Sequence, residues 1–240
     1  MAHLCHNAPV STIALIPSRR GGRRLSGNDL RRFAGRPIIE WSIDAARRSL
    51  CTGEVFVATD DRETARVAHR AKAKVVFMSD VEPTDGAATF AVALVDFLYR
   101  FSLTNFEPAF LCCLCPTAPF VTPERIREGW ELISSKGGAT SVFSVDPSRP
   151  SDLAAVHRDA RVLYWLSADA LRTEGRLFTK LAWPLELGPQ EAQDLDAESD
   201  WTDAERRFER LVHPARLKAM QRKSASEARQ AGKSKSRATG

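Results

Sequence analysis

Short apolar runs that alternate with amphipathic segments constrain the fold of this chain most strongly. The expected strands span 13–16, 54–59, 74–78, 109–115 and 139–145, and the helices expected after the first four span 37–49, 62–71, 87–99 and 123–135. Strands that alternate with helices in this way favour a parallel sheet with right-handed crossovers. We therefore predict an α/β fold, doubly wound and mostly parallel, with helices on both faces.

The second half of the chain carries weaker signals. Strands are expected at 162–165 and 183–187, a short helix and turn at 169–176, and a last helix at 201–212. One α/β domain with an extension is the default for 240 residues, and we place that domain at 11–213. Residues 214–240 hold eight Lys or Arg and one Glu, which predicts a disordered basic tail or a frayed helix.

A loop rich in arginine and glycine follows the first strand. Between residues 13 and 37, seven arginines oppose one acid, Asp29, and the pair Gly21-Gly22 allows a close backbone approach. Backbone N–H groups and guanidinium forks of such a loop can hold a polyphosphate. The spacing fits neither the Walker P-loop nor the Rossmann glycine pattern. An exposed turn on a basic protein is the alternative.

The remaining charge is acidic. Outside the arginine-rich loop and the tail, Asp and Glu outnumber Lys and Arg. This pattern favours a local anionic ligand over a broad nucleic-acid surface, so we do not expect nucleic acid as a partner.

Two aspartates near the end of the domain could bind a metal ion. Asp194 and Asp196 are two residues apart, so on an extended segment their side chains point the same way. Mg²⁺ is commonly held by one or two carboxylates together with substrate phosphates. The alternative is that these acids favour the start of the following helix through its dipole, and Asp200 fits that explanation better.

The cysteines and the apolar runs bear on the cellular compartment in which the protein is expected. Five cysteines are present, and three fall in F-L-C-C-L-C, where alternation points Cys112 and Cys113 to opposite faces of a strand. Cys112 and Cys113 are therefore not expected to share a metal ion, and they are better explained as small buried side chains in a reducing environment. No secretory signal is expected in 1–10, and no apolar run is long enough to span a bilayer. We expect a cytoplasmic protein without membrane contact.

Three motifs carry a resemblance to a known family. They are P-S-R-R-G-G-R-R-L-S-G-N-D with G-R-P-I-I (17–29 and 35–39), C-C-L-C-P-T-A-P-F (112–120), and Q-D-L-D-A-E-S-D-W (193–201). Together they resemble the cytidylyltransferases that activate nonulosonic (sialic-type) acids, and the second motif resembles the pseudaminic acid branch in particular. The resemblance covers most of 12–145 and 162–212.

This resemblance implies a nucleotide-diphospho-sugar transferase-like fold and a reaction. CMP would pass from CTP to an acidic sugar, with release of pyrophosphate. Arg19 and Arg23 are implied as catalytic groups on the triphosphate, and Asp194 and Asp196 as ligands of Mg²⁺. The implied nucleotide-binding residues are Ser18, Arg19, Arg20, Gly21, Gly22, Arg23, Arg24, Asn28, Asp60, Pro116 and Thr117.

The sequence also departs from the family pattern. Arg23 stands where the family has its first loop lysine, and Asn28-Asp29 stand where it has a lysine–asparagine pair. If the alignment shifts by one residue, Arg20 and Arg24 take the places of Arg19 and Arg23. The family's long insertion, with sugar-binding residues and a dimer-forming arm, is reduced to 146–161, which leaves a homodimer open. Two alternatives follow. One is a weak or inactive relative that binds nucleotide or a protein partner, and the other is a sugar-nucleotide transferase with a smaller acceptor.

Overall fold

A computed structural model describes residues 11–18, 28–78, 87–102, 107–135, 138–146, 148, 150, 158–192, 195 and 198–212. The chain divides into two compact units, residues 1–196 and 197–240. The second unit contributes one described helix, α6 (Glu198–Val212), which begins three residues before the helix predicted at 201–212 and ends at the same residue. The domain boundary predicted at residue 213 stays a prediction.

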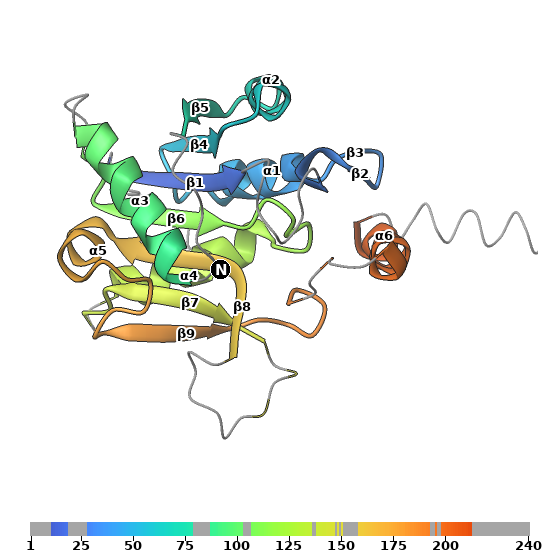
Figure 1. Cartoon of the computed structure of the whole chain (residues 1–240). Helices are drawn as coiled ribbons and strands as arrows, with labels where there is room; N and C mark the ends of the chain where they lie inside the picture. Colours follow the sequence, from blue (N-terminus) through green and yellow to red (C-terminus); the bar gives the residue numbers. More distant parts are fainter. Residues whose placement is uncertain are drawn as a thin grey trace, which may run out of the picture. The chain divides into compact units, whose positions relative to one another are not determined.

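The first unit is built on a seven-stranded sheet with the order β5-β4-β1-β6-β8-β7-β9 (Figure 1). The strands are β1 (Thr12–Ser18), β4 (Glu54–Thr59), β5 (Lys74–Phe77), β6 (Phe110–Leu114), β7 (Ser141–Val145), β8 (Asp159–Ser167) and β9 (Ala182–Glu186). All run in one direction except β8, which is antiparallel to both β6 and β7. The predicted mostly parallel sheet is confirmed.

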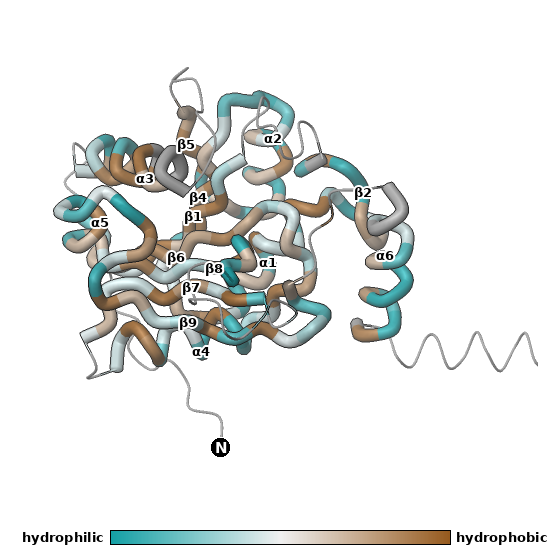
Figure 2. Tube along the Cα trace, turned by 60° about the horizontal axis from the view of Figure 1, so that its bottom comes forward, coloured by the Kyte–Doolittle hydropathy of each residue, from teal (hydrophilic) through white to brown (hydrophobic). Residues whose placement is uncertain are grey.

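Helices cover both faces of this sheet, as a doubly wound fold requires. They are α1 (Ile39–Ser49), α2 (Arg62–Arg70), α3 (Ala87–Ser102), α4 (Pro123–Ser134) and α5 (Ala168–Glu174). Apolar side chains of α1, α2 and α4 share one buried core with the sheet, and those of α3 and α5 share the other. Figure 2 shows the hydrophobic stretches along the strands and hydrophilic residues on outward helix surfaces. No helix in the described ranges has the length and apolar character needed to cross a membrane.

Strand β6 shows how the two cores are separated. Cys112 lies in the core under α1 and α4, and Cys113 in the core under α3. Both thiols are fully buried, and burial raises the pKa of each well above its usual value. Of the four described cysteines, Cys51, Cys112 and Cys113 are buried and Cys115 is partly buried, which agrees with the prediction of small buried side chains for Cys112 and Cys113.

Strand β8 is longer than the predicted 162–165. Its hydrogen bonds to β6 and β7 extend it in both directions, although a register irregularity interrupts β7 between Phe143 and Val145. There the Ser144 hydroxyl accepts hydrogen bonds from the backbone N–H groups of Val162 and Leu163, at 3.2 and 3.1 Å. A side chain thus replaces part of the regular ladder, which no apolar pattern reveals.

Gly129 allows a close contact between α4 and β8. A Cβ atom at this position would lie 2.6 Å from Cδ1 of Trp165, a fully buried side chain whose Nε1 donates to the carbonyl of Ile126. Gly129→Ala improves helix propensity by about 1 kcal/mol, but crowding a packed core typically costs about 1–3 kcal/mol. We expect a lower free energy of unfolding in urea titrations. Glu131→Ala, an exposed change on the same helix, is the matched control, and equal or greater stability of Gly129→Ala would contradict this packing.

Candidate functional site

The candidate site lies at the carboxyl edge of the parallel strands. Strand β1 lies between β4 and β6, and Ser18 at its end pairs in register with Thr59 at the end of β4. The described ends of the two motif loops, after β1 and after β6, lie at this edge (Figure 1). Open α/β sheets bind ligands beyond the carboxyl ends of their strands, where the strand order reverses. The predicted location of the site therefore agrees with the topology.

Several predicted site residues lie outside the described residues: Arg19, Arg20, Gly21, Gly22, Arg23, Arg24, Asp194 and Asp196. Asn28 is described through its backbone, as the first residue of the 3₁₀ helix η1 (Asn28–Leu30). The approach of the arginine-rich loop to the acid pair thus stays a prediction. Within the described ranges, no group of three or more His, Cys, Asp or Glu side chains is arranged to hold a metal ion.

Ser18 and Asp29 join the two ends of the arginine-rich loop. The buried hydroxyl of Ser18 donates a hydrogen bond of 2.5 Å to Oδ2 of Asp29, the central residue of η1. Burial raises the pKa of Asp29 to about 6, and the hydrogen bond from Ser18 acts in the opposite direction. Asp29 is not among the site residues predicted from the sequence. Its place opposite an asparagine of the resembling family was the available signal.

The two aspartates after β4 have different roles. Asp61 caps α2, because its buried carboxylate accepts hydrogen bonds from the backbone N–H and the hydroxyl of Thr64, at 2.9 and 3.0 Å. Asp60, the predicted nucleotide-binding residue, is exposed at the end of the strand. Capping therefore accounts for Asp61, and the ligand role of Asp60 stays a prediction.

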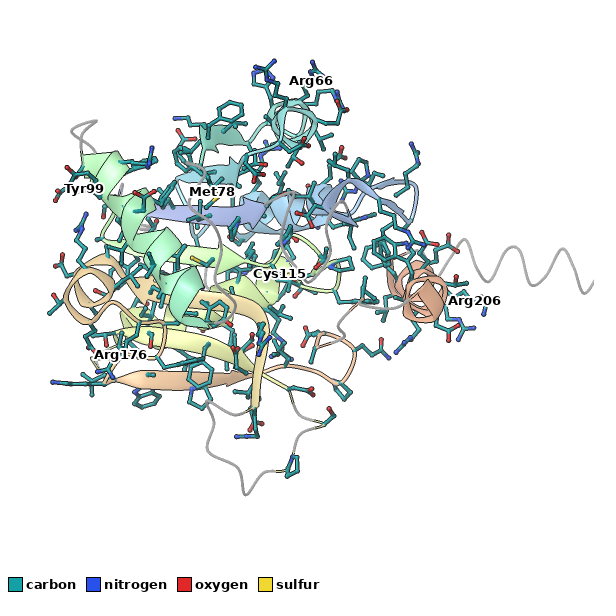
Figure 3. The ribbon with its side chains drawn as sticks, in the orientation of Figure 1. Arg66, Met78, Tyr99, Cys115, Arg176 and Arg206 are labelled. Carbon is teal, nitrogen blue, oxygen red and sulfur yellow. The ribbon has the colours of Figure 1, made fainter. Side chains whose placement is uncertain are left out.

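The loop after β6 is held in place by α1 and by its own turn. The hydroxyl of Ser42 donates to the carbonyl oxygen of Cys115 at 2.8 Å. Thr117 is buried, and its Oγ1 lies 3.2 Å from Sγ of Cys115, which Figure 3 labels at this end of β6. This geometry shows a rigid turn through Pro116 and Thr117. Their predicted contact with the nucleotide is not tested by it.

A small hairpin returns the chain from the arginine-rich loop to α1. Strands β2 (Arg32–Phe33) and β3 (Arg36–Pro37) meet at a turn in which Gly35 has φ +92°, a conformation that favours glycine. The Arg36 guanidinium stacks 3.5 Å from the ring centroid of Trp41 and lies 3.6 Å from Asp44. The ring of Phe33 packs edge-on against Phe120 of the loop after β6, with centroids 6.2 Å apart. The hairpin thus connects the two motif loops.

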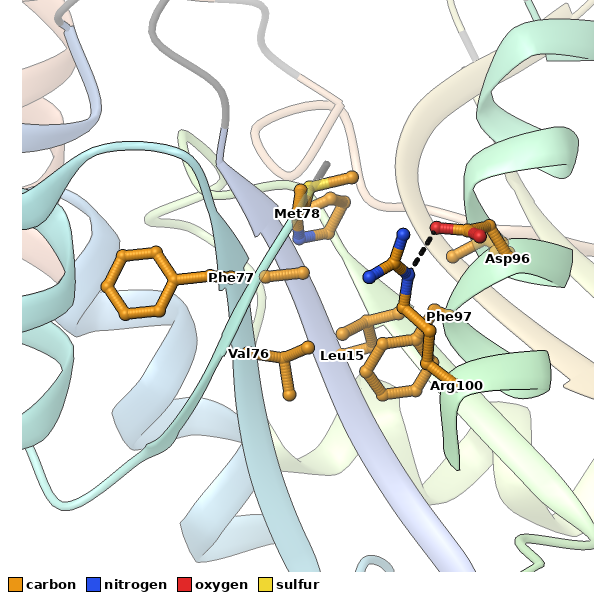
Figure 4. Close-up of a pocket in the computed structure, with 10 residues that line it drawn as sticks. Leu15, Val76, Phe77, Met78, Asp96, Phe97 and Arg100 are labelled. Carbon is orange, nitrogen blue, oxygen red and sulfur yellow. Dashed lines mark hydrogen bonds and ion pairs between the residues drawn. The ribbon is translucent and has the colours of Figure 1, made fainter. Parts of the chain in front are cut away.

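An apolar pocket lies beneath the same edge, between β1, β4, β5 and α3 (Figure 4). Leu15, Val76 and Phe97 line it, and Nε of Arg100 donates to Asp96 at 2.8 Å beside it. Among the described residues that line it, Arg100 supplies the guanidinium, and this group is already paired with a carboxylate, so the pocket does not suit a triphosphate.

Asp29 should make stability depend on pH. Because its pKa in the folded protein is about 6, above the usual value near 3.8, the folded state retains a proton that the unfolded chain has lost. The free energy of unfolding should therefore fall as pH rises from 4 through 6. In urea titrations Asp29→Asn should be more stable than the wild type by up to about 3 kcal/mol at pH 7.5, since each unit of the pKa difference corresponds to about 1.4 kcal/mol, and the difference should fall below about 1 kcal/mol near pH 4. Parallel pH profiles would contradict the assignment.

The chain is similar to known cytidylyltransferases over the region that contains the first two motifs. Residues 13–178 match the family described as cytidylyltransferase. The chain is 34% identical over 135 residues to CMP-N,N'-diacetyllegionaminic acid synthase of Legionella pneumophila, covering 56% of this chain and 57% of that protein. It is 28% identical over 122 residues to pseudaminic acid cytidylyltransferase of Campylobacter jejuni, covering 51% and 53%. The chain spans about half the length of these curated relatives.

Solved structures share the fold. CMP:2-keto-3-deoxy-manno-octonic acid synthetase, solved with CTP, aligns with a TM-score of 0.65 at 15% identity, over 84% of this chain and 99% of that chain. The 4-diphosphocytidyl-2C-methyl-D-erythritol synthase of Anaerococcus prevotii aligns with a TM-score of 0.61 at 11% identity, over 84% and 100%. Both comparisons show the same doubly wound architecture.

Proposed function

Because the chain belongs to the cytidylyltransferase family, we propose that it transfers CMP from CTP to a nonulosonic acid of the pseudaminic or sialic type. The anomeric hydroxyl of the acid would attack the α-phosphorus, and the bond to the β-phosphate would break to release pyrophosphate. The observation that carries this proposal is the family match over 13–178, which includes both loops at the carboxyl edge. The names of the two relatives above support an acidic sugar as the acceptor.

The proposed chemistry relies on positioning and on charge neutralisation. Arg19 and Arg23 would bind the triphosphate, with Arg20 and Arg24 as the alternatives if the register shifts by one residue. The Ser18–Asp29 hydrogen bond and the β2–β3 hairpin fix the strand end at which this loop begins and the segment to which it returns.

Asp194 and Asp196 are the proposed ligands of Mg²⁺. Two carboxylates at alternate positions are an oxygen donor set of the kind this ion takes, and substrate phosphates complete it. The ion, when bound, would offset negative charge on the leaving pyrophosphate.

A pyrophosphate-release assay tests the proposed function. The assay compares CTP with UTP and ATP, and offers pseudaminic, legionaminic, N-acetylneuraminic and 3-deoxy-manno-octulosonic acids. We expect release with CTP and at least one nonulosonic acid. Release with none of these acids, together with clear CTP binding in calorimetry, would identify the inactive relative instead.

A smaller acceptor is the second candidate function. Strand β7 ends at Val145 and β8 begins at Asp159, so little chain is available there for an acceptor-binding insertion. Pyrophosphate release with the eight-carbon acid, and none with the nine-carbon acids, would favour this candidate.

Replacing Asp194 tests the metal assignment. Asp194→Asn should lower kcat by about 10²–10³-fold, the usual loss when one charged group at a reacting centre is removed. Asp203→Asn, on the exposed side of α6, is the control and should leave kcat unchanged. Equal kcat values for the two variants across a Mg²⁺ titration would remove Asp194 from the metal site.

Asp29 should also control nucleotide affinity. Its ionised carboxylate, between Ser18 and the returning loop, opposes binding of the negatively charged triphosphate. Asp29→Asn should therefore bind CTP about 2–10-fold more tightly at pH 8, in line with the modest energies of screened charges. Below pH 6 the wild type is largely protonated, so the difference should shrink. Calorimetry at pH 5.5 and 8 measures this, and equal affinities at pH 8 would exclude a charge effect.

A further inference from the structure

An open groove lies on the surface between α2 and β5, the last strand at one end of the sheet (Figure 1). It has a volume of about 550 Å³. Four basic residues of α2 line it together with two residues of β5: Arg62, Arg66, His69, Arg70, Val75 and Phe77. None of them is among the predicted site residues, so the proposed function leaves this groove unexplained.

The α2 side of the groove is positively charged. Arg62, Arg66 and Arg70 are four residues apart in turn, so they follow one side of the helix, and all three are exposed. Glu63 pairs with Arg66 at 3.0 Å, whereas no acid in the described part of the chain pairs with Arg62 or Arg70. The helix thus presents uncompensated positive charge to solvent, which attracts an acidic ligand.

The β5 side of the groove offers backbone groups and an exposed ring. The N–H of Met78 donates to the carbonyl oxygen of Thr59 of β4 at 3.0 Å. Because backbone groups alternate along a strand, the N–H and C=O groups of Val75 and Phe77 point to the outer side, where no described strand pairs with them. The Phe77 side chain is 56% exposed, and Figure 4 shows its ring turned away from Leu15. An edge of this kind can accept an extended peptide as a further strand.

The spacing of the three arginines matches an extended peptide with acids at alternate positions. Residues four apart in a helix are separated by about 6 Å along its axis, and residues two apart in a strand are separated by about 6.6 Å. α2 connects the parallel strands β4 and β5, and its buried residues Val67 and Ala68 belong to the same core as Val57 and Val75 of these strands. A crossover helix runs roughly antiparallel to its strands, so carboxylates on a strand added to β5 could face successive arginines.

Other macromolecules suit the groove less well. If two copies of this chain paired β5 with β5 about a two-fold axis, the arginines of the two α2 helices would come together, and like charges repel. The outward N–H and C=O groups of β5 match the alternating donors and acceptors of a peptide backbone, which a nucleic acid lacks. These two arguments favour an acidic peptide.

We propose that this groove binds an acidic, extended segment of a partner protein. The segment pairs with the outer edge of β5 and places carboxylates against Arg62, Arg66 and Arg70. Main-chain hydrogen bonds supply much of the affinity, and the charges select the partner and its register. The inference does not depend on the proposed function, because binding in the groove involves no residue of the transfer site.

Peptide binding to the full chain tests the charge contribution. The probe is a capped, fluorescein-labelled peptide of alternating glutamate and threonine, and fluorescence anisotropy gives its Kd. The double variant Arg66→Glu/Arg70→Glu should raise Kd about 10–30-fold, because each reversal replaces a screened attraction by a repulsion. Added salt should weaken binding to the wild type. A wild type that does not bind the peptide, or equal Kd values for wild type and variant, would overturn the proposal.

Arg176→Glu is the matched control. Arg176 is 53% exposed and pairs with Glu174 at 2.8 Å, much as Arg66 pairs with Glu63. It follows α5, which packs on the face of the sheet opposite α2, and Figure 3 shows Arg66 and Arg176 on different sides of the first unit. We expect this variant to bind the peptide as the wild type does. A Kd raised as much as in the double variant would show a general charge effect and overturn the proposal.

N-methylated peptides test the strand pairing with the wild type alone. Methylation at every glutamate, or at every threonine, removes the backbone donors from one edge of the peptide. One of these two peptides should bind much more weakly than the other, and equal Kd values would exclude pairing with β5. Labelled oligothymidylate is the competing ligand. If it binds more tightly than the peptide and loses affinity in Arg66→Glu/Arg70→Glu, the groove is a nucleic-acid site and the proposal is overturned.

Discussion

The hydrogen bonds that hold β1 in the interior of the sheet, between β4 and β6, determine where the candidate site can lie. β1 pairs in parallel with β4 on one side and with β6 on the other. It ends at Ser18, and the bond from Ser18 to Asp29 ties this strand end to the segment where the arginine-rich loop returns. The loop is therefore anchored at both ends, at the point where open sheets bind ligands. The hairpin contact between Phe33 and Phe120 extends this support to the loop after β6.

Much of the fold could be predicted because buried parallel strands have a clear sequence signal. Strand β4 was predicted with the bounds that the structure shows, Glu54–Thr59, since its apolar run faces helices on both sides. Strand β8 was predicted too short because its extent depends on pairing with two strands distant in sequence. The Ser144 hydroxyl at its irregular register is a tertiary feature, and alternation of apolar residues does not reveal it.

The candidate site was less predictable than the fold, because the role of a polar side chain depends on its neighbours in the folded chain. The motifs indicated which loops form the edge, but Asp60 and Asp61 look alike in sequence, and only the geometry shows that Asp61 is the cap. The pKa of Asp29 depends on its burial in the folded chain and on the hydrogen bond from Ser18 of β1.

Asp29 contributes two distinct properties to the site, a hydrogen bond with Ser18 and a charge that depends on pH, whereas an asparagine would contribute only the hydrogen bond. A hydrogen bond between this side chain and Ser18 is compatible with either protonation state, so the support for the loop does not require a charge. The charge is a separate property, and burial opposes it strongly enough to hold the pKa near 6. An acid at this position therefore need not prevent triphosphate binding. It makes the electrostatic character of the edge depend on pH, within the range where an asparagine would leave it constant.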